Sequence, residues 1–193
     1  MVETNDRRLP VGIQSFEEIR KNGYLYVDKT DIIWQLANKG KTYNYLIRPR
    51  RFGKSVLVDT LEAYFMGKKE LFEGLKIMQM ETEWVKRPVI RLDMSRAGAE
   101  PETLRSYLNN IFKQYEEEYS LAPDPTDSLA DRFNAIIVGA YEQTGQQVAI
   151  LIDEYDSPLQ HSWKTPQHEA CTAIYREVFA ILKADDKYEK FVF

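Results

Sequence analysis

Residues 43–56 read Tyr-Asn-Tyr-Leu-Ile-Arg-Pro-Arg-Arg-Phe-Gly-Lys-Ser-Val, and this stretch decides the fold class. Its first five residues favour a β-strand, and from Lys54 to Met66 apolar side chains recur at helical spacing. We therefore expect a strand over 43–47, a loop, and a helix that begins at Lys54. A Gly-Lys-Ser triplet between a strand and a helix indicates a phosphate-binding loop.

The loop supplies the groups that phosphate recognition needs. Backbone amides at a helix N-terminus surround an anion, a lysine reaches the outer phosphates, and a hydroxyl holds Mg²⁺. Lys54 is the candidate for the second role, catalytic as well as binding, and Ser55 for the third. The residues expected to contact the nucleotide are Arg50, Arg51, Phe52, Gly53, Lys54, Ser55 and Val56.

The loop also departs from the full Walker A pattern. That pattern begins with a glycine, and the corresponding position here is Arg48, followed by Pro49. Because arginine does not readily adopt positive φ, we expect the start of the loop to differ from the standard shape. The arginines at 48, 50 and 51 either strengthen the positive field at the phosphates or bind a nucleic-acid backbone. A solvated, salt-bridged loop is the remaining interpretation.

A second apolar stretch ends in two acids. Residues 148–152 are an unbroken apolar run followed by Asp153 and Glu154, and such continuity is typical of a strand covered on both faces. Ligands of open α/β sheets lie at the carboxyl ends of the strands, so the two acids have the Walker B arrangement. We expect Asp153 to hold the Mg²⁺ shell and Glu154 to act as general base on the attacking water. A solvated turn is the alternative.

The remaining elements follow from helical periodicity and turn residues. The other expected helices are 16–22, 31–38, 101–119, 128–143 and 167–183, and the other expected strands are 89–94 and the beginning of one at 191–193. Strands separated by helices predict an α/β fold in which helices sandwich a parallel sheet. Asp93, at the end of 89–94, is either a site residue or an ordinary loop acid. Asp156 either supports the residues of the site or forms a turn, and the turn is the favoured interpretation.

Composition bounds the class of protein. The 193 residues carry a net charge of −4 and are 44% hydrophobic, which fits one globular domain and argues against a broadly cationic surface. Cys171 is the single cysteine, so an intramolecular disulfide is excluded and a reducing, cytoplasmic compartment is expected. The polar N-terminus and the lack of a long apolar run predict neither secretion nor a membrane span.

Four motifs together resemble a known family. They are LPVGIQSF at 9–16, GYLYVDKT at 23–30, RPRRFGKS at 48–55 and LIDEYD at 151–156. With them the chain resembles the AAA-ATPase-like domains found at the N-terminus of bacterial proteins whose C-terminal part resembles PD-(D/E)XK nucleases. The arginine-proline start of the loop is usual in that family.

The resemblance implies a P-loop NTPase fold of the ASCE/AAA-like class that uses ATP and Mg²⁺. Residues 1–193 would then be a single domain, with 1–42 as a helical lead-in and 43–193 as an incomplete nucleotide-binding core. The resemblance also implies that a sensor residue, an arginine finger, the last core strand and a nuclease-like domain follow residue 193. We therefore expect a core truncated at its C-terminal end.

The leading functional hypothesis is a Mg²⁺-dependent ATPase module of a larger cytoplasmic bacterial protein, with ATP as its partner. One alternative is a non-hydrolysing nucleotide-binding or scaffold module. Another is a nucleic-acid-binding module that uses the basic loop from Arg48 to Lys54.

Overall fold

The computed structural model describes residues 8–47, 52–183 and 187–193. The chain forms two compact units, which divide between Lys86 and Arg87. The expected lead-in, residues 1–42, therefore shares its compact unit with residues 43–86.

The first unit is helical. It contains α1 (Phe16–Lys21), α2 (Thr30–Lys39) and α3 (Lys54–Phe65), and then the short 3₁₀ helices η1 (Lys69–Phe72) and η2 (Lys76–Gln79). Ser15 caps α1, because its side chain accepts a hydrogen bond of 3.3 Å from the Glu18 amide. The three helices confirm those expected at 16–22, 31–38 and from Lys54 to Met66.

The strand expected over 43–47 is not formed. Tyr43 makes a single bridge, and residues 44–47 belong to no helix or strand. Aromatic and β-branched residues suit a pleated surface, but a strand also needs a continuous hydrogen-bonded ladder with a neighbour. The composition of this segment was therefore not enough to make it a strand.

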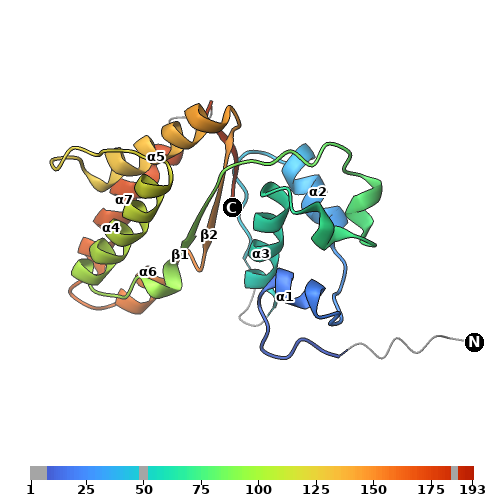
Figure 1. The fold of residues 1–193 in the computed structure, drawn as a ribbon. Coiled ribbons are helices and arrows are strands. Elements are labelled where there is room, and N and C mark those ends of the chain that lie inside the picture. The colour runs from blue at the N-terminus through green and yellow to red at the C-terminus, as the bar shows by residue number, and fades with distance from the viewer. Residues whose placement is uncertain (1–7, 48–51, 184–186) are drawn as a thin grey trace, which may run out of the picture. The chain divides into compact units, whose positions relative to one another are not determined.

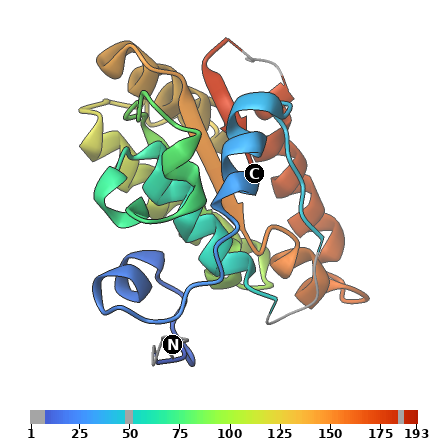
Figure 2. The same cartoon turned by 90° about the vertical axis from the view of Figure 1, so that its right-hand side faces the viewer.

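The lead-in packs directly on α3 (Figure 2), and α1 lies against that helix. The amide of Phe16, at the start of α1, donates a 2.6 Å hydrogen bond to the carboxylate of Asp59 on α3. The buried ring of Phe16 meets Tyr26 and Phe72, with centroids 5.1 and 5.0 Å away. Apolar packing and a charge-assisted hydrogen bond thus hold the lead-in to the helix that carries Lys54.

Asp28 and Thr30 join the lead-in to the segment around η2. Asp28 accepts hydrogen bonds from the Thr30 amide and hydroxyl, at 2.9 and 2.7 Å, and from the Lys76 amide at 2.8 Å. The Thr30 hydroxyl in turn accepts a 3.1 Å hydrogen bond from the Ile77 amide. Partial burial raises the pKa of Asp28, but these hydrogen bonds outweigh it, so the pKa lies below its ordinary value.

Replacing Thr30 by valine is expected to destabilise the first unit by about 1–3 kcal/mol, because a buried amide loses its acceptor. Thr30 is fully buried, and valine keeps its shape while removing the oxygen that binds Ile77. Urea denaturation followed by tryptophan fluorescence measures the change, since Trp34 and Trp84 both lie in this unit. The exposed Thr82→Val is the control. Equal stability of the two variants contradicts the prediction.

The second unit is built on a parallel sheet. The sheet has three strands, β1 (Val89–Asp93), β2 (Val148–Asp153) and β3 (Glu189–Val192), in that order. On one face stand α4 (Pro101–Glu118), α5 (Leu129–Thr144) and α7 (His168–Phe179), as Figure 1 shows. The α/β class and the strands expected at 89–94 and 148–152 are confirmed. A helical layer on the other face stays a prediction.

Three shorter helices complete the second unit: η3 (Met94–Arg96), α6 (Ser157–Ser162) and η4 (Ala180–Lys183). The helix α6 was not among the helices expected from the sequence. Pro158 lies in the first turn of α6, where a missing amide hydrogen breaks no helical bond.

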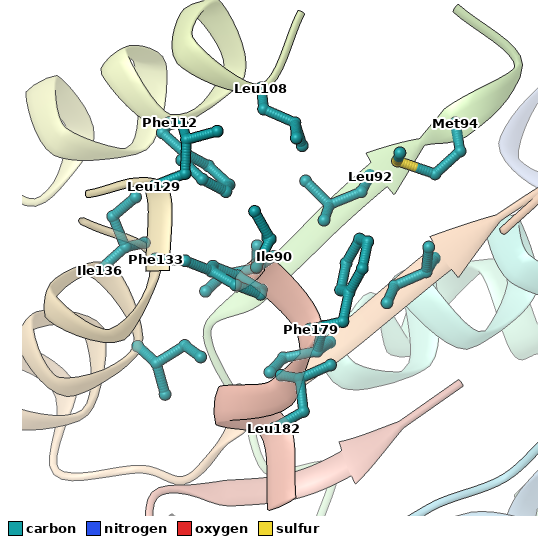
Figure 3. Close-up of a cluster of buried hydrophobic side chains, with 14 of the residues drawn as sticks. Ile90, Leu92, Met94, Leu108, Phe112, Leu129, Phe133, Ile136, Phe179 and Leu182 are labelled. Atoms are coloured by element: carbon teal, nitrogen blue, oxygen red, sulfur yellow. The ribbon is translucent and has the colours of Figure 1, made fainter. Parts of the chain in front are cut away.

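The core of this unit lies between the sheet and the three long helices (Figure 3). Ile90 and Leu92 of β1 project into it and meet aromatic rings from the helices, such as Phe133 and Phe179. The outer edge of β1 is bound by tyrosine hydroxyls of α4. The Tyr107 hydroxyl accepts a 3.0 Å hydrogen bond from the Asp93 amide, and the Tyr115 hydroxyl accepts a 2.7 Å hydrogen bond from the Arg91 amide. Side chains thus protect an edge that would otherwise invite pairing.

Candidate functional site

The helix α3 begins at a glycine whose conformation is special. Gly53 has φ of +73°, and its carbonyl accepts the first helical hydrogen bond, 3.0 Å from the Leu57 amide. Apart from the two chain neighbours, no atom of the described residues lies within 4 Å of the position that a Cβ would take. The requirement for glycine is therefore one of backbone conformation.

The N-terminus of α3 is suited to an anion. Gly53, the N-cap residue of α3, has no side chain with which to cap the helix, and the first turn of α3 contains no acid. Helix N-termini carry partial positive charge and amides without helical partners, so they attract phosphate. Lys54, Ser55 and Val56 are half-buried in this turn, whereas the side chain of Phe52 is 62% exposed. Arg50 and Arg51, like Arg48, lie outside the described residues.

The strand β2 delivers a buried acid. All six residues of β2 are buried, and Asp153 at its carboxyl end is only 7% exposed. One carboxylate oxygen of Asp153 accepts a 3.0 Å hydrogen bond from the Glu154 amide. A buried carboxylate with one oxygen engaged in this way is a hard oxygen donor that fits Mg²⁺.

Glu154 follows in a rare backbone conformation. Its φ is +50°, in the left-handed region that residues other than glycine seldom adopt. Its carbonyl accepts a 2.9 Å hydrogen bond from the amide of Ser157, the first residue of α6. Left-handed residues other than glycine persist only where the surroundings hold them, and they are frequent at functional sites.

Two further acids lie near this end of the sheet. Asp93 is in register with Asp153 on the neighbouring strand, and both point away from the core, because Leu92 and Ile152 point into it. The carboxylate of Asp93 accepts hydrogen bonds from the Ser95 amide, at 3.2 Å, and from the Ser95 hydroxyl, at 2.6 Å. Asp93 therefore caps η3. Asp156 precedes α6, and its backbone carbonyl accepts a 2.8 Å hydrogen bond from the Gln160 amide, as a turn former does.

The loop residues thus gather in the first unit and the acids in the second. A family described as "Predicted AAA-ATPase" matches residues 10–193. The chain belongs to this family.

A relative of this AAA-ATPase-like chain is an uncharacterized protein in the vnfD 5′ region of Azotobacter chroococcum mcd 1. The two are 33% identical over 190 residues, which are 96% of this chain and 36% of the relative. The AAA-ATPase-like chain therefore spans about a third of that relative's length. No solved structure matches the chain.

Membership confirms the resemblance to AAA-ATPase-like domains and supports a nucleotide-binding, ATPase-like module. The C-terminal nuclease-like domain stays a prediction. Within the described ranges of this AAA-ATPase-like chain, no group of three or more His, Cys, Asp or Glu side chains is placed to hold a metal. The described helices also include none that is long and apolar enough to cross a membrane.

Some residues around the AAA-ATPase motifs were not found by sequence reasoning. Asp59 fastens α1 to α3, and Tyr175 of α7 donates a 2.8 Å hydrogen bond to the carbonyl of Tyr155, the residue after Glu154. Neither position stands in a motif. Tyr155 does stand in LIDEYD, so only the motif itself could have directed attention to it.

Proposed function

We propose that this chain is the ATP-binding P-loop domain and Mg²⁺-dependent ATPase module of a larger bacterial protein. The observation that carries the proposal is the start of α3, where Gly53 has a left-handed backbone and precedes Lys54 and Ser55 in a first turn that contains no acid. That arrangement suits the phosphates of a nucleotide. The buried strand β2, which ends at Asp153 and is followed by Glu154, supports the proposal independently.

In this proposal the phosphates bind at the N-terminus of α3. The ammonium of Lys54 neutralises charge on the outer phosphates. The Ser55 hydroxyl and the Asp153 carboxylate would hold Mg²⁺, since both are oxygen donors of the kind that this ion prefers. The ion, when bound, supplies positive charge at the phosphate oxygens.

Glu154 serves as general base in the same proposal. Its carboxylate orients a water molecule and accepts a proton from it as the water oxygen bonds to the terminal phosphorus. The bond from that phosphorus to the bridging oxygen breaks, and ADP leaves with the electron pair.

Replacing Lys54 by alanine is expected to weaken MgATP binding about 10- to 100-fold, because a charge-assisted contact to phosphate is lost. Isothermal titration of the purified protein with ATP and Mg²⁺ measures the affinity. Lys69→Ala is the matched control, since it removes an exposed lysine from the same unit.

The titration and an assay of phosphate release together separate the proposal from a non-hydrolysing module. Absence of heat and of any thermal shift for the unaltered protein contradicts nucleotide binding. MgATP binding without release of phosphate favours a non-hydrolysing module.

A further inference from the structure

The turn after β2 is held by an anchor on another helix. Glu154 has a left-handed backbone, and Tyr155 follows it directly. The carbonyl of Tyr155 accepts a 2.8 Å hydrogen bond from the hydroxyl of Tyr175, which lies on α7. The ring of Tyr155 packs edge-on against Tyr175 and at a steep angle to Phe179, with centroids 5.4 and 5.2 Å away. Both the backbone and the side chain of Tyr155 are therefore fixed to α7.

Tyr175 is well suited to be a permanent anchor. Its side chain belongs to the core of the second unit, and only 4% of the residue is exposed. Burial raises the pKa of Tyr175 far above its ordinary value, so the hydroxyl stays protonated and remains a donor. A donor held in a packed core moves little, and its acceptor is held equally still.

The anchor constrains Glu154 because the chain has only one residue in which to turn. Asp153 is fixed by the hydrogen-bonded ladder of β2, and Tyr155 is fixed by Tyr175. Glu154 must connect these two points, and its carbonyl also accepts the Ser157 amide at 2.9 Å. Without the anchor the residue is free to relax towards a right-handed or extended backbone, which would re-aim its carboxylate.

We propose that Tyr175 is a positioning residue, whose hydroxyl holds the turn that aims the carboxylate of Glu154 at the attacking water. This inference rests on the proposed ATPase function. Tyr175 touches neither nucleotide nor water in this proposal, and it acts only through Tyr155 and Glu154.

The test is Tyr175→Phe in the whole protein, which removes the hydroxyl and keeps the ring. The expected result is a fall in kcat of about 10- to 100-fold, because catalytic groups tolerate little displacement. KM for MgATP is expected to stay within about twofold, since the phosphate contacts are made elsewhere. Exchange of the Ser157 amide hydrogen is expected to become about 5- to 10-fold faster, because its acceptor is the carbonyl of Glu154.

Tyr141→Phe on α5 is the matched control. Tyr141 also makes an edge-on ring contact, 5.2 Å from Tyr188, but it lies just before the opposite end of β2. It is expected to leave kcat and the exchange of Ser157 unchanged.

The outcomes separate this inference from the proposed function. Unchanged exchange at Ser157 in Tyr175→Phe overturns the anchor, and faster exchange with unchanged kcat overturns the positioning role. An unaltered protein that neither binds nor hydrolyses MgATP overturns the proposed ATPase, and the positioning role falls with it. The exchange of Ser157 still decides whether the anchor exists.

Discussion

Replacing Glu154 by glutamine is expected to slow ATP hydrolysis by about 10²- to 10⁴-fold, the usual contribution of a positioned general base. Glutamine keeps the length and hydrogen-bonding capacity of the side chain but cannot accept the proton of the attacking water. Binding of MgATP is expected to persist, because the phosphates are held by the first turn of α3. Single-turnover release of phosphate measures the chemical step, and isothermal titration measures the binding.

The neighbouring acid provides the control for this prediction. Asp156 lies two residues further along the same turn, where its side chain accepts a hydrogen bond from the side chain of Gln160 in α6. Asp156→Asn is expected to change the rate of hydrolysis by no more than about twofold, as befits a residue outside the chemistry. Equal loss of activity in the two variants would show that the turn tolerates no change there, and that Glu154 has no distinct role as base.

Local signals located the helices well. The helices expected at 16–22 and 101–119 are formed as α1 and α4. These patterns succeed because a helix closes its hydrogen bonds within a few residues of the same segment. The buried strand β2 was predicted for a similar reason, since an unbroken apolar run of that length suits a covered strand.

Features that depend on distant partners were predicted less well. Residues 43–47 have the composition of a strand, yet a strand exists only through a ladder that another segment completes. The helix α6 was missed because Pro158 breaks a helix in its interior but not in its first turn.

The candidate site shows the same limit. Gly53 and Asp153 were predicted because each stands at a junction that local sequence defines, a helix start or a strand end. The residues that support them come from elsewhere: Asp59 binds the amide of Phe16, and Tyr175 binds the carbonyl of Tyr155. Such partners are 43 and 20 residues apart in sequence, so only the folded chain identifies them.

One such distant pair fastens α4 to α5. The guanidinium of Arg132 binds both carboxylate oxygens of Glu116, at 2.6 and 2.8 Å, and it also contacts the side chain of Asn109. Glu116 is only 5% exposed, on the helical face that covers the sheet of the second unit. The hydrogen bond to Glu116 raises the pKa of Arg132, so the guanidinium stays charged.

Replacing Arg132 by methionine is expected to destabilise the second unit by about 3–5 kcal/mol, because a buried carboxylate is left without its cation. Hydrogen exchange of the β2 amides in increasing urea measures the loss in this unit. Arg105→Met is the matched control, since Arg105 joins α4 to Glu177 of α7 at 3.3 Å, and this more exposed pair is expected to contribute about 0–1 kcal/mol. The double variant Glu116→Leu with Arg132→Met is expected to recover most of the stability, since it removes the stranded charge together with its partner. An Arg132 variant no less stable than the Arg105 variant would mean that Glu116 escapes to water or takes up a proton, and that apolar packing alone holds the two helices together.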